Sequence, residues 1–162
     1  MKSKIEIFLT DCDGCLTDGG MYYDQTGNEF KRFNAKDGKG IELLRKSGIL
    51  TGIVTGENTK IVEERAKKLK IDELHQGAIN KLEVLNEILE RRNLNPENVA
   101  YVGDDVNDLE IIRVCGISFA PADAVNEVKS AVKVVLSKGG GQGAVREAAD
   151  YVIDFNNKLK EE

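Results

Sequence analysis

Residues 4–18 read KIEIFLTDCDGCLTD, an apolar run followed by three acidic residues within eight positions. The run at 4–10 predicts a β-strand, and the polar stretch after it predicts a loop at the carboxyl end of that strand. Four more short strands are expected at 50–54, 99–102, 116–119 and 132–135. Helices are expected between and after them at 38–47, 59–69, 81–92, 108–114, 124–130 and 144–155. This alternation predicts an α/β fold, a doubly wound parallel sheet with helices on both faces.

Capping residues and turn residues mark the expected element boundaries. Asn58, Asn80 and Asn95 are expected to cap helix N-termini, and Gly48 is expected to end the first helix. Residues 21–23 and 29–33 flank the turn sequence DQTGN, which predicts a β-hairpin over about 20–34 that projects as a flap. The chain lacks repeats and Pro-rich linkers, so we expect one domain over 1–162, with a Gly-rich tail from about 138.

The composition excludes several classes of protein. The 162 residues are 41% hydrophobic and 31% charged, with a formal net charge of -5, which is unlike disordered or basic nucleic-acid-binding chains. No apolar run approaches about 18 residues, and the start MKSKIEIFLTD reaches acidic residues early, so we expect neither a signal peptide nor membrane association. Three cysteines in a chain of this length fit a reducing compartment, and we expect the cytoplasm. An anionic substrate would need local positive charge.

Polar residues gather where the expected strands end, which is where open α/β sheets bind ligands. Asp11 and Asp13 follow the first strand, and on an extended backbone residues two apart point the same way. Hydrolysis of a phosphate ester needs such a pair. One carboxylate attacks phosphorus, and a second carboxyl group protonates the leaving oxygen and later activates water. This pattern predicts Asp11 as the nucleophile and Asp13 as the general acid and base.

The same chemistry needs positive charge and hydrogen-bond donors around the phosphate. Asp11, Asp104 and the backbone carbonyl of Asp13 would make an oxygen-only site of the kind that Mg²⁺ prefers, so we expect Mg²⁺ as cofactor. The phosphate oxygens would receive bonds from the Thr55 hydroxyl, the backbone N–H near Gly56 and the Lys81 ammonium. Two further acids, Asp105 and Asp108, would orient waters and Lys81.

Four ordered motifs resemble those of the haloacid-dehalogenase-like phosphatase superfamily. They are Asp11-x-Asp13-Gly-x-x-Thr17-Asp18, Val54-Thr55-Gly56, Lys81 and Gly103-Asp104-Asp105-x-x-Asp108. Four longer stretches between Asn34 and Glu147 are similar to the 3-deoxy-D-manno-octulosonate 8-phosphate phosphatase family: NAKDGxG at 34–40, HQG at 75–77, NVAYVGDD at 98–105 and GGGQGAVRE at 139–147. That resemblance implies a small capless enzyme of lipopolysaccharide biosynthesis and a homotetramer built by the hairpin, in which neighbouring subunits close the active site.

The resemblance also implies roles for particular residues. The substrate-binding positions of the family match Asn34, Lys36, Asp37, Gly38, Arg65 and Lys81. Two positions depart from the octulosonate pattern, because Glu57 stands where members of the family have arginine and Glu42 stands where some of them do. Glu57 together with Lys68 resembles phosphatases of nine-carbon sugar-acid 9-phosphates, of the N-acylneuraminate or KDN type, which are therefore the alternative.

Other interpretations compete at several motifs. Cys12 and Cys15 could form a redox or zinc motif, but adjacent carboxylates disfavour thiolates, and we expect both to be packing residues. The only histidine, His75, has a surface or capping role at least as readily as a catalytic one.

The Gly-rich run 139–143 resembles a dinucleotide fingerprint only by letters, and we expect a mobile segment that covers the substrate, with Arg146 as a phosphate or carboxylate contact. A receiver-like signalling module also uses a phosphorylated aspartate. Receivers, however, place that residue on a middle strand after an earlier acidic pair.

Overall fold

A computed structural model describes residues 3–161, and its centre is a six-stranded sheet in the order β5-β4-β1-β6-β7-β8. All neighbouring strands pair in parallel, and Ile7 of β1 is in register with Leu50 on one side and Val99 on the other. The strands are β1 (Ile7–Thr10), β4 (Leu50–Val54), β5 (Glu73–His75), β6 (Val99–Val102), β7 (Ile117–Ala120) and β8 (Val134–Val135). The carboxyl end of β1 therefore lies beside those of β4 and β6.

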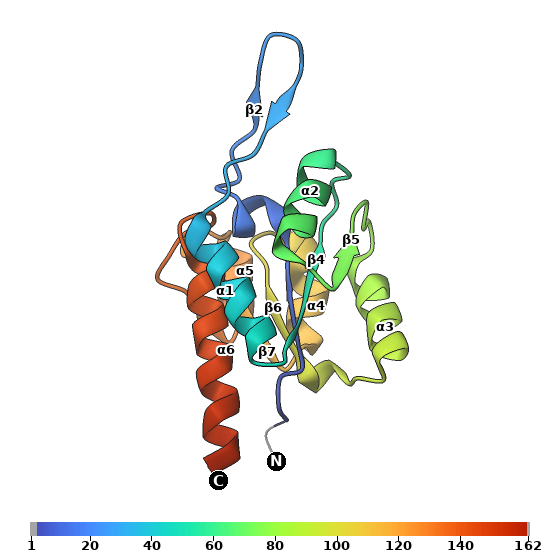
Figure 1. Ribbon diagram of the computed structural model, residues 1–162, viewed down its shortest axis with the longest axis vertical. Helices are drawn as coiled ribbons and strands as arrows, with labels where there is room; N and C mark the ends of the chain where they lie inside the picture. The colour runs from blue at the N-terminus through green and yellow to red at the C-terminus, as the bar shows by residue number, and fades with distance from the viewer. Residues whose placement is uncertain (1–2, 162) are drawn as a thin grey trace.

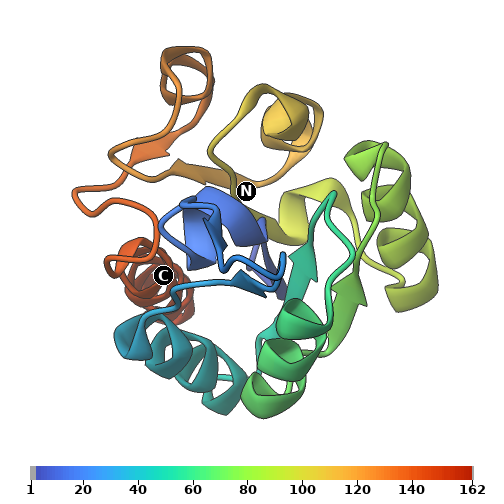
Figure 2. The ribbon, with the colours of Figure 1, turned by 90° about the horizontal axis from the view of Figure 1, so that it is seen from above.

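Helices cover both faces of this sheet, as Figures 1 and 2 show. One face packs against α1 (Ala35–Lys46), α2 (Lys60–Leu69) and α6 (Ala144–Glu161), with buried residues such as Ile41 and Val152. The other packs against α3 (Lys81–Arg92), α4 (Leu109–Val114) and α5 (Asn126–Ala131), with buried residues such as Ile88. Each fully buried aliphatic side chain contributes roughly 1.5–3 kcal/mol. The two cores on opposite faces confirm the doubly wound α/β fold.

Several element boundaries differ from the expected ones. Thr59 caps α2, since its hydroxyl accepts the Val62 N–H at 3.4 Å, so the assignment of Asn58 as the cap was wrong. Helix α1 begins at Ala35, three residues before the expected start, because the Asn34 side chain accepts the Lys36 N–H. Asn80 caps α3 and Asn95 precedes a short 3₁₀ turn, Pro96–Asn98, as expected.

Strand β5 has no counterpart among the expected strands. It consists of three residues, Glu73–His75, and begins with an acidic side chain instead of a β-branched one. Glu73 is buried, and its carboxylate is paired with Arg91, Arg92 and His75. A buried strand can contain a charged residue when ion pairs compensate the charge, and its sequence then lacks the hydrophobic pattern by which strands are predicted.

The expected hairpin is present, and Figure 1 shows it standing away from the body of the molecule. Strands β2 (Tyr22–Tyr23) and β3 (Glu29–Phe30) pair antiparallel. The Asp24 carboxylate closes the turn by accepting the backbone N–H groups of Thr26 and Asn28 at 2.8 and 3.0 Å. A function of this hairpin as a flap stays a prediction.

The Gly-rich segment 139–143 packs against the loop that follows β1, and all of its residues except Gln142 are buried. Its expected role as a mobile cover stays a prediction. Gly140 and Gly141 are buried against the backbone of Gly14, Thr17 and Asp18, so closely that a Cβ atom at Gly140 would overlap the Gly14 carbonyl oxygen. The Gly141 N–H donates to the carbonyl of Cys15 at 3.0 Å. The glycines therefore permit close approach of two backbones, and they support the loop that follows β1.

Candidate active site

Asp11 occupies the position directly after β1, at the carboxyl edge of the sheet. Its backbone N–H donates to the Val102 carbonyl at 3.0 Å, and its Oδ1 accepts the Cys12 N–H at 2.7 Å. A helical turn, Cys12–Leu16, then carries the chain away, with Gly14 at a φ of 82°. A side chain at Gly14 would overlap the Asp104 carboxylate. Glycine at this position thus allows the loop to pack against Asp104.

In the described chain, the Lys81 ammonium is the only one that contacts Asp11. Lys81 is the first residue of α3, and 2% of its surface is exposed. Its Nζ lies 2.9 Å from Asp11 Oδ2 and 2.8 Å from Asp108 Oδ1. The hydroxyl of Tyr101 donates to the same Asp108 oxygen at 2.6 Å. Asp108, itself held by Tyr101, therefore positions the Lys81 ammonium where it also compensates negative charge on Asp11.

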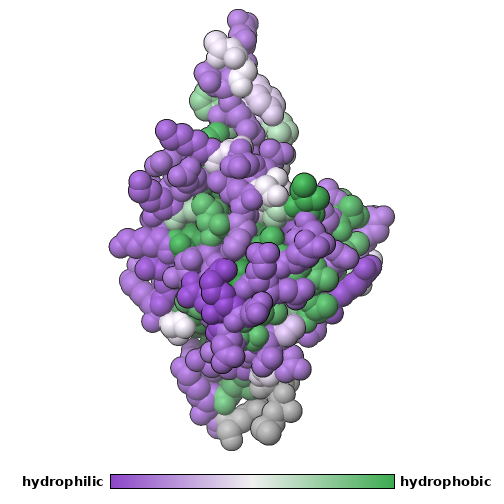
Figure 3. Space-filling view, turned by 90° about the vertical axis from the view of Figure 1, so that its right-hand side faces the viewer, coloured by the Kyte–Doolittle hydropathy of each residue, from purple (hydrophilic) through white to green (hydrophobic). Residues whose placement is uncertain are grey.

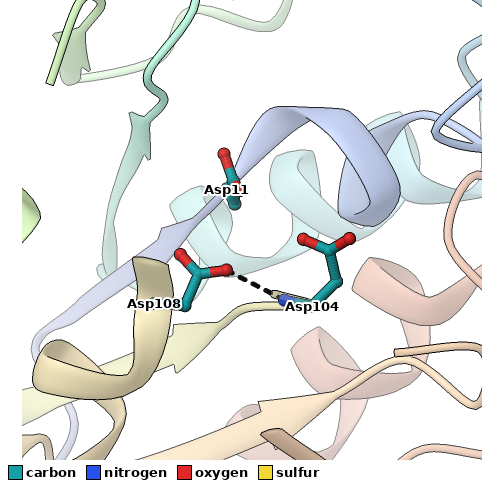
Figure 4. A group of neighbouring side chains, drawn as sticks. All are labelled: Asp11, Asp104 and Asp108. Atoms are coloured by element: carbon teal, nitrogen blue, oxygen red, sulfur yellow. Dashed lines mark hydrogen bonds between the residues drawn. The ribbon is translucent and has the colours of Figure 1, made fainter. Parts of the chain in front are cut away.

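Three carboxylates converge at this place. Asp11, Asp104 and Asp108 each offer an oxygen within 4.8 Å of the others, and Figure 4 shows their side chains together. Asp108 Oδ1 is bonded as described above, while its Oδ2 accepts the backbone N–H groups of Asp104 and Asp105 at 2.9 and 3.3 Å. Asp108 is fully buried and does not line the adjoining cavity, whereas Asp11 and Asp104 do, so these two side chains are available to a cation that enters from the cavity.

The electrostatics of the two available carboxylates fit a divalent cation. Burial, and then repulsion from Asp108, raises the pKa of Asp11 from 3.8 to about 6, although Lys81 opposes the rise. Burial, followed by repulsion from Asp11, Asp108 and Asp105, raises the pKa of Asp104 to about 7. The single positive charge of Lys81 does not compensate the three carboxylates, and every side-chain atom that could bind a cation here is an oxygen. An oxygen-binding ion such as Mg²⁺ satisfies both conditions.

A cavity of about 320 Å³ opens in front of these carboxylates. Its lining includes four of the predicted catalytic and metal-binding residues, Asp11, Asp13, Thr55 and Asp104, together with Gly56 and Asp105. Lys81 lies behind Asp11 instead of in the lining. The remaining lining residues are Gly14, Gly19, Met21, Glu57 and Asn107. The sequence predicted Met21 only as part of the hairpin, and Asn107 occupies a variable position of the Gly103–Asp108 motif, so neither was expected to line the cavity.

The other predicted substrate-binding residues do not line this cavity in the described chain. Asn34 caps α1 and donates to the Gly141 carbonyl, and Asp37 Oδ1 accepts the Arg146 N–H at 2.9 Å. Arg65 stacks on the ring of Phe33 at 5.1 Å, next to Gly38.

Arg146 is paired with Asp150 and, with Lys36, borders a different cavity of about 450 Å³. Within the described chain, none of these six predicted residues (Asn34, Lys36, Asp37, Gly38, Arg65 and Arg146) lines the Asp11 cavity.

One contact at the site had no signal in the sequence. Lys31, on the returning arm of the hairpin, places its Nζ 2.8 Å from Asp13 Oδ1. The two residues are 18 positions apart, and no motif joins them.

Cys12 and Cys15 are packing residues, as expected, whereas His75 contacts a buried carboxylate instead of capping a helix. Cys12 and Cys15 are free and buried, and burial followed by repulsion from nearby aspartates raises the pKa of both thiols. His75 accompanies Glu73 at the sheet edge, where its Nε2 lies 2.9 Å from the carboxylate.

This parallel sheet, with two aspartates after its first strand and with Lys81 and Asp104 beside them, defines a hydrolase of the haloacid dehalogenase-like class. The family model for haloacid dehalogenase-like hydrolases matches residues 72–148. The 3-deoxy-D-manno-octulosonate 8-phosphate phosphatase KdsC of Escherichia coli K12 is 41% identical over 158 residues, which cover 98% of this chain and 84% of that protein. The chain belongs to the 3-deoxy-D-manno-octulosonate 8-phosphate phosphatase family, and the expectation of a phosphatase is confirmed.

Solved structures agree. A probable YrbI family phosphatase from Pseudomonas syringae pv. phaseolica 1448a superimposes with a TM-score of 0.93 at 41% identity, covering 97% of this chain and 89% of that one. The 3-deoxy-D-manno-octulosonate 8-phosphate phosphatase of Moraxella catarrhalis, solved with a magnesium ion, a phosphate ion and KDO, gives 0.92 at 33% identity, covering 97% and 90%.

Proposed function

We propose that this chain hydrolyses 3-deoxy-D-manno-octulosonate 8-phosphate, the substrate for which its relatives are named, through a phosphate ester on Asp11. The observation that carries the proposal is the common cavity of Asp11, Asp13, Thr55 and Asp104, with the Lys81 ammonium 2.9 Å from Asp11 Oδ2. This arrangement places a nucleophile, a second carboxyl group and positive charge around a space for phosphate.

Two half-reactions follow from these positions. A carboxylate oxygen of Asp11 attacks phosphorus, the bond from phosphorus to the ester oxygen breaks, and the leaving oxygen takes a proton from Asp13. Water then attacks the phosphorus of the aspartyl phosphate and gives a proton to Asp13, which releases phosphate and restores both carboxyl groups. The hydroxyl of Thr55 and the N–H near Gly56 would hold the phosphate oxygens.

We assign the Mg²⁺ site to Asp11, Asp104 and the backbone carbonyl of Asp13. The crowded carboxylates and their raised pKa values support this choice. When bound, the ion reduces the repulsion between an attacking carboxylate and a dianionic phosphate.

Glu57 favours a second candidate substrate. It lines the cavity beside Gly56, where the resemblance leads us to expect arginine. An anion at this point disfavours a substrate carboxylate that a cation would hold. Hydrolysis of a nine-carbon sugar-acid 9-phosphate, of the N-acylneuraminate or KDN type, is therefore the alternative.

We further propose a homotetramer in which the hairpin contacts neighbouring chains. Four large hydrophobic or aromatic side chains of the hairpin, Met21, Tyr22, Tyr23 and Phe30, are 44% to 59% exposed. Figure 3 shows the hairpin as a narrow projection with green, hydrophobic patches on it. Covering these side chains with a second copy would remove apolar surface from water and close the cavity. Light scattering coupled to gel filtration measures the mass, and a monomer would contradict this assignment.

The direct experiment is a phosphate-release assay on both sugar-acid phosphates, with and without Mg²⁺. We expect release that needs the ion and that Asp11→Asn abolishes. Full turnover by the Asp11→Asn chain would overturn the proposal.

The chain offers no helix among residues 3–161 that is long and apolar enough to cross a membrane. We expect a cytoplasmic enzyme.

A further inference from the structure

Lys31 is buried although it belongs to a largely exposed hairpin. Its side chain is 1% exposed, whereas that of Arg32 is 66% exposed. The Lys31 ammonium lies 2.8 Å from Asp13 Oδ1 and 3.1 Å from Glu29 Oε1. Removing an ammonium from water is costly unless partners compensate it, so this position requires its two carboxylates.

Other contacts fix the base of the hairpin at the same loop. Phe33 forms an antiparallel bridge with Thr17, and the Tyr22 hydroxyl donates to Asp18 Oδ2 at 2.6 Å. Both arms of the hairpin are therefore attached to the segment that follows Asp13. This attachment of the hairpin base determines where the Lys31 ammonium lies.

The Lys31 contact restricts the Asp13 carboxyl group to one orientation. Within residues 3–161, Asp13 accepts two side-chain bonds, from Lys31 Nζ and from the Thr17 hydroxyl at 3.3 Å, and both fall on Oδ1. Asp13 lines the cavity and Lys31 does not. The ammonium therefore contacts Asp13 from outside the cavity, and it would influence the reaction through Asp13. The second oxygen, Oδ2, remains for the leaving group.

We propose that Lys31 is a positioning residue, which holds Asp13 by Oδ1 so that Oδ2 meets the leaving oxygen, and which thereby links the hairpin to the chemistry. This inference rests on the proposed function, since it assumes that Asp13 delivers the proton. An ion pair with a purely structural role would instead stabilise the fold, and its loss would change the cleavage rates of all substrates alike.

The leaving group distinguishes the two roles. A sugar alkoxide is strongly basic and needs a proton as the bond to phosphorus breaks, whereas p-nitrophenolate leaves without one. Misplacing Asp13 should therefore slow cleavage of the sugar ester and spare that of the aryl ester. The comparison is made in single turnovers with enzyme in excess, so that only the first half-reaction is measured.

The experiment compares Lys31→Met with the wild-type chain on p-nitrophenyl phosphate and on 3-deoxy-D-manno-octulosonate 8-phosphate. General acid catalysis contributes typically 10²–10⁴-fold, and partial misplacement should lose roughly 10- to 100-fold with the sugar ester. We expect the aryl ester to change by less than about threefold. Arg32→Met, at the neighbouring exposed cation, should leave both rates unchanged. Thermal unfolding shows whether each variant is folded, and Lys31→Gln replaces Lys31→Met if the latter is not.

The outcomes separate the two proposals. Equal loss on both esters, or no loss on either, in a folded Lys31 variant would overturn the positioning role while the phosphatase proposal stands. A wild-type chain that cleaves neither ester would overturn the proposed function and, with it, the role of Lys31.

Discussion

The Nζ atom of Lys81 lies 2.9 Å from Oδ2 of Asp11, although the two residues are 70 positions apart. The contact exists because Asn80 starts α3 at the carboxyl edge of the sheet, where β1 also ends. A buried ammonium at this distance opposes the charge that gathers when a carboxylate approaches phosphate.

Replacing Lys81 should damage both catalysis and stability. Lys81→Met leaves Asp11 and Asp108 buried without their cation, and breaking a buried pair typically costs about 3–5 kcal/mol. We expect phosphate release to fall by at least about 100-fold, as for the loss of an electrostatic donor. Lys60→Met is the matched control, since Lys60 is the first residue of α2 and is exposed. Wild-type turnover in Lys81→Met would contradict the assignment.

The Gly-rich segment should prove structural. Gly140→Ala places a methyl group on the Gly14 carbonyl, and overpacking of this kind costs about 1–3 kcal/mol or more. We expect a lower melting temperature and reduced activity, because Gly14 belongs to the loop that follows Asp11 and packs against Asp104. Gly27→Ala, at a hairpin turn with open space around it, should cost only about 1–2 kcal/mol for its positive φ and leave activity unchanged. Unchanged activity in Gly140→Ala, as in Gly27→Ala, would argue against close packing at Gly140.

Stabilisation by Mg²⁺ should depend on pH. Both relevant shifts are upward, to about 6 for Asp11 and about 7 for Asp104, so the folded metal-free chain bears a charge penalty above these values. The penalty is relieved as the pH falls through 7 and then 6 and the carboxylates bind protons.

Thermal unfolding at pH 8.0 and pH 5.5, with and without Mg²⁺, measures this dependence. We expect a larger upward shift of the melting temperature at pH 8.0, because fewer protons compete with the ion. Asp104→Asn should remove most of the shift. A shift of equal size at both pH values would show that the ion binds elsewhere.

Glu57 should control the choice of sugar acid. We expect Glu57→Arg to raise the ratio of kcat/KM for the eight-carbon over the nine-carbon acid by roughly tenfold, because a cation replaces an anion in the cavity wall. Glu64→Arg reverses an exposed charge on α2 and serves as the control. An unchanged ratio would exclude Glu57 from substrate selection.

The central site could be predicted from sequence because parallel strands end at one edge of a sheet. Asp11, Thr55 and Asp104 follow three adjacent strands, β1, β4 and β6, so their convergence follows from the alternation of strands and helices. Their chemical roles stay proposals.

Contacts made by segments that return to the site could not be predicted. The approach of Lys31 to Asp13 depends on how the hairpin folds back, and the packing of Gly140 on Gly14 depends on the path of the chain before α6. Neither has a local sequence pattern. Strand β5 was missed for a related reason, because the charge of Glu73 is compensated by side chains from α3.

The most direct test of the central claim is chemical trapping of the phosphate ester on Asp11. Enzyme turning over the sugar-acid phosphate is quenched in acid and treated with borohydride, which reduces an aspartyl phosphate to homoserine, and the peptide containing residue 11 is analysed by mass spectrometry. We predict homoserine at position 11 only when substrate and Mg²⁺ are present. Homoserine at another aspartate, or an unmodified residue 11 during full turnover, would contradict the account.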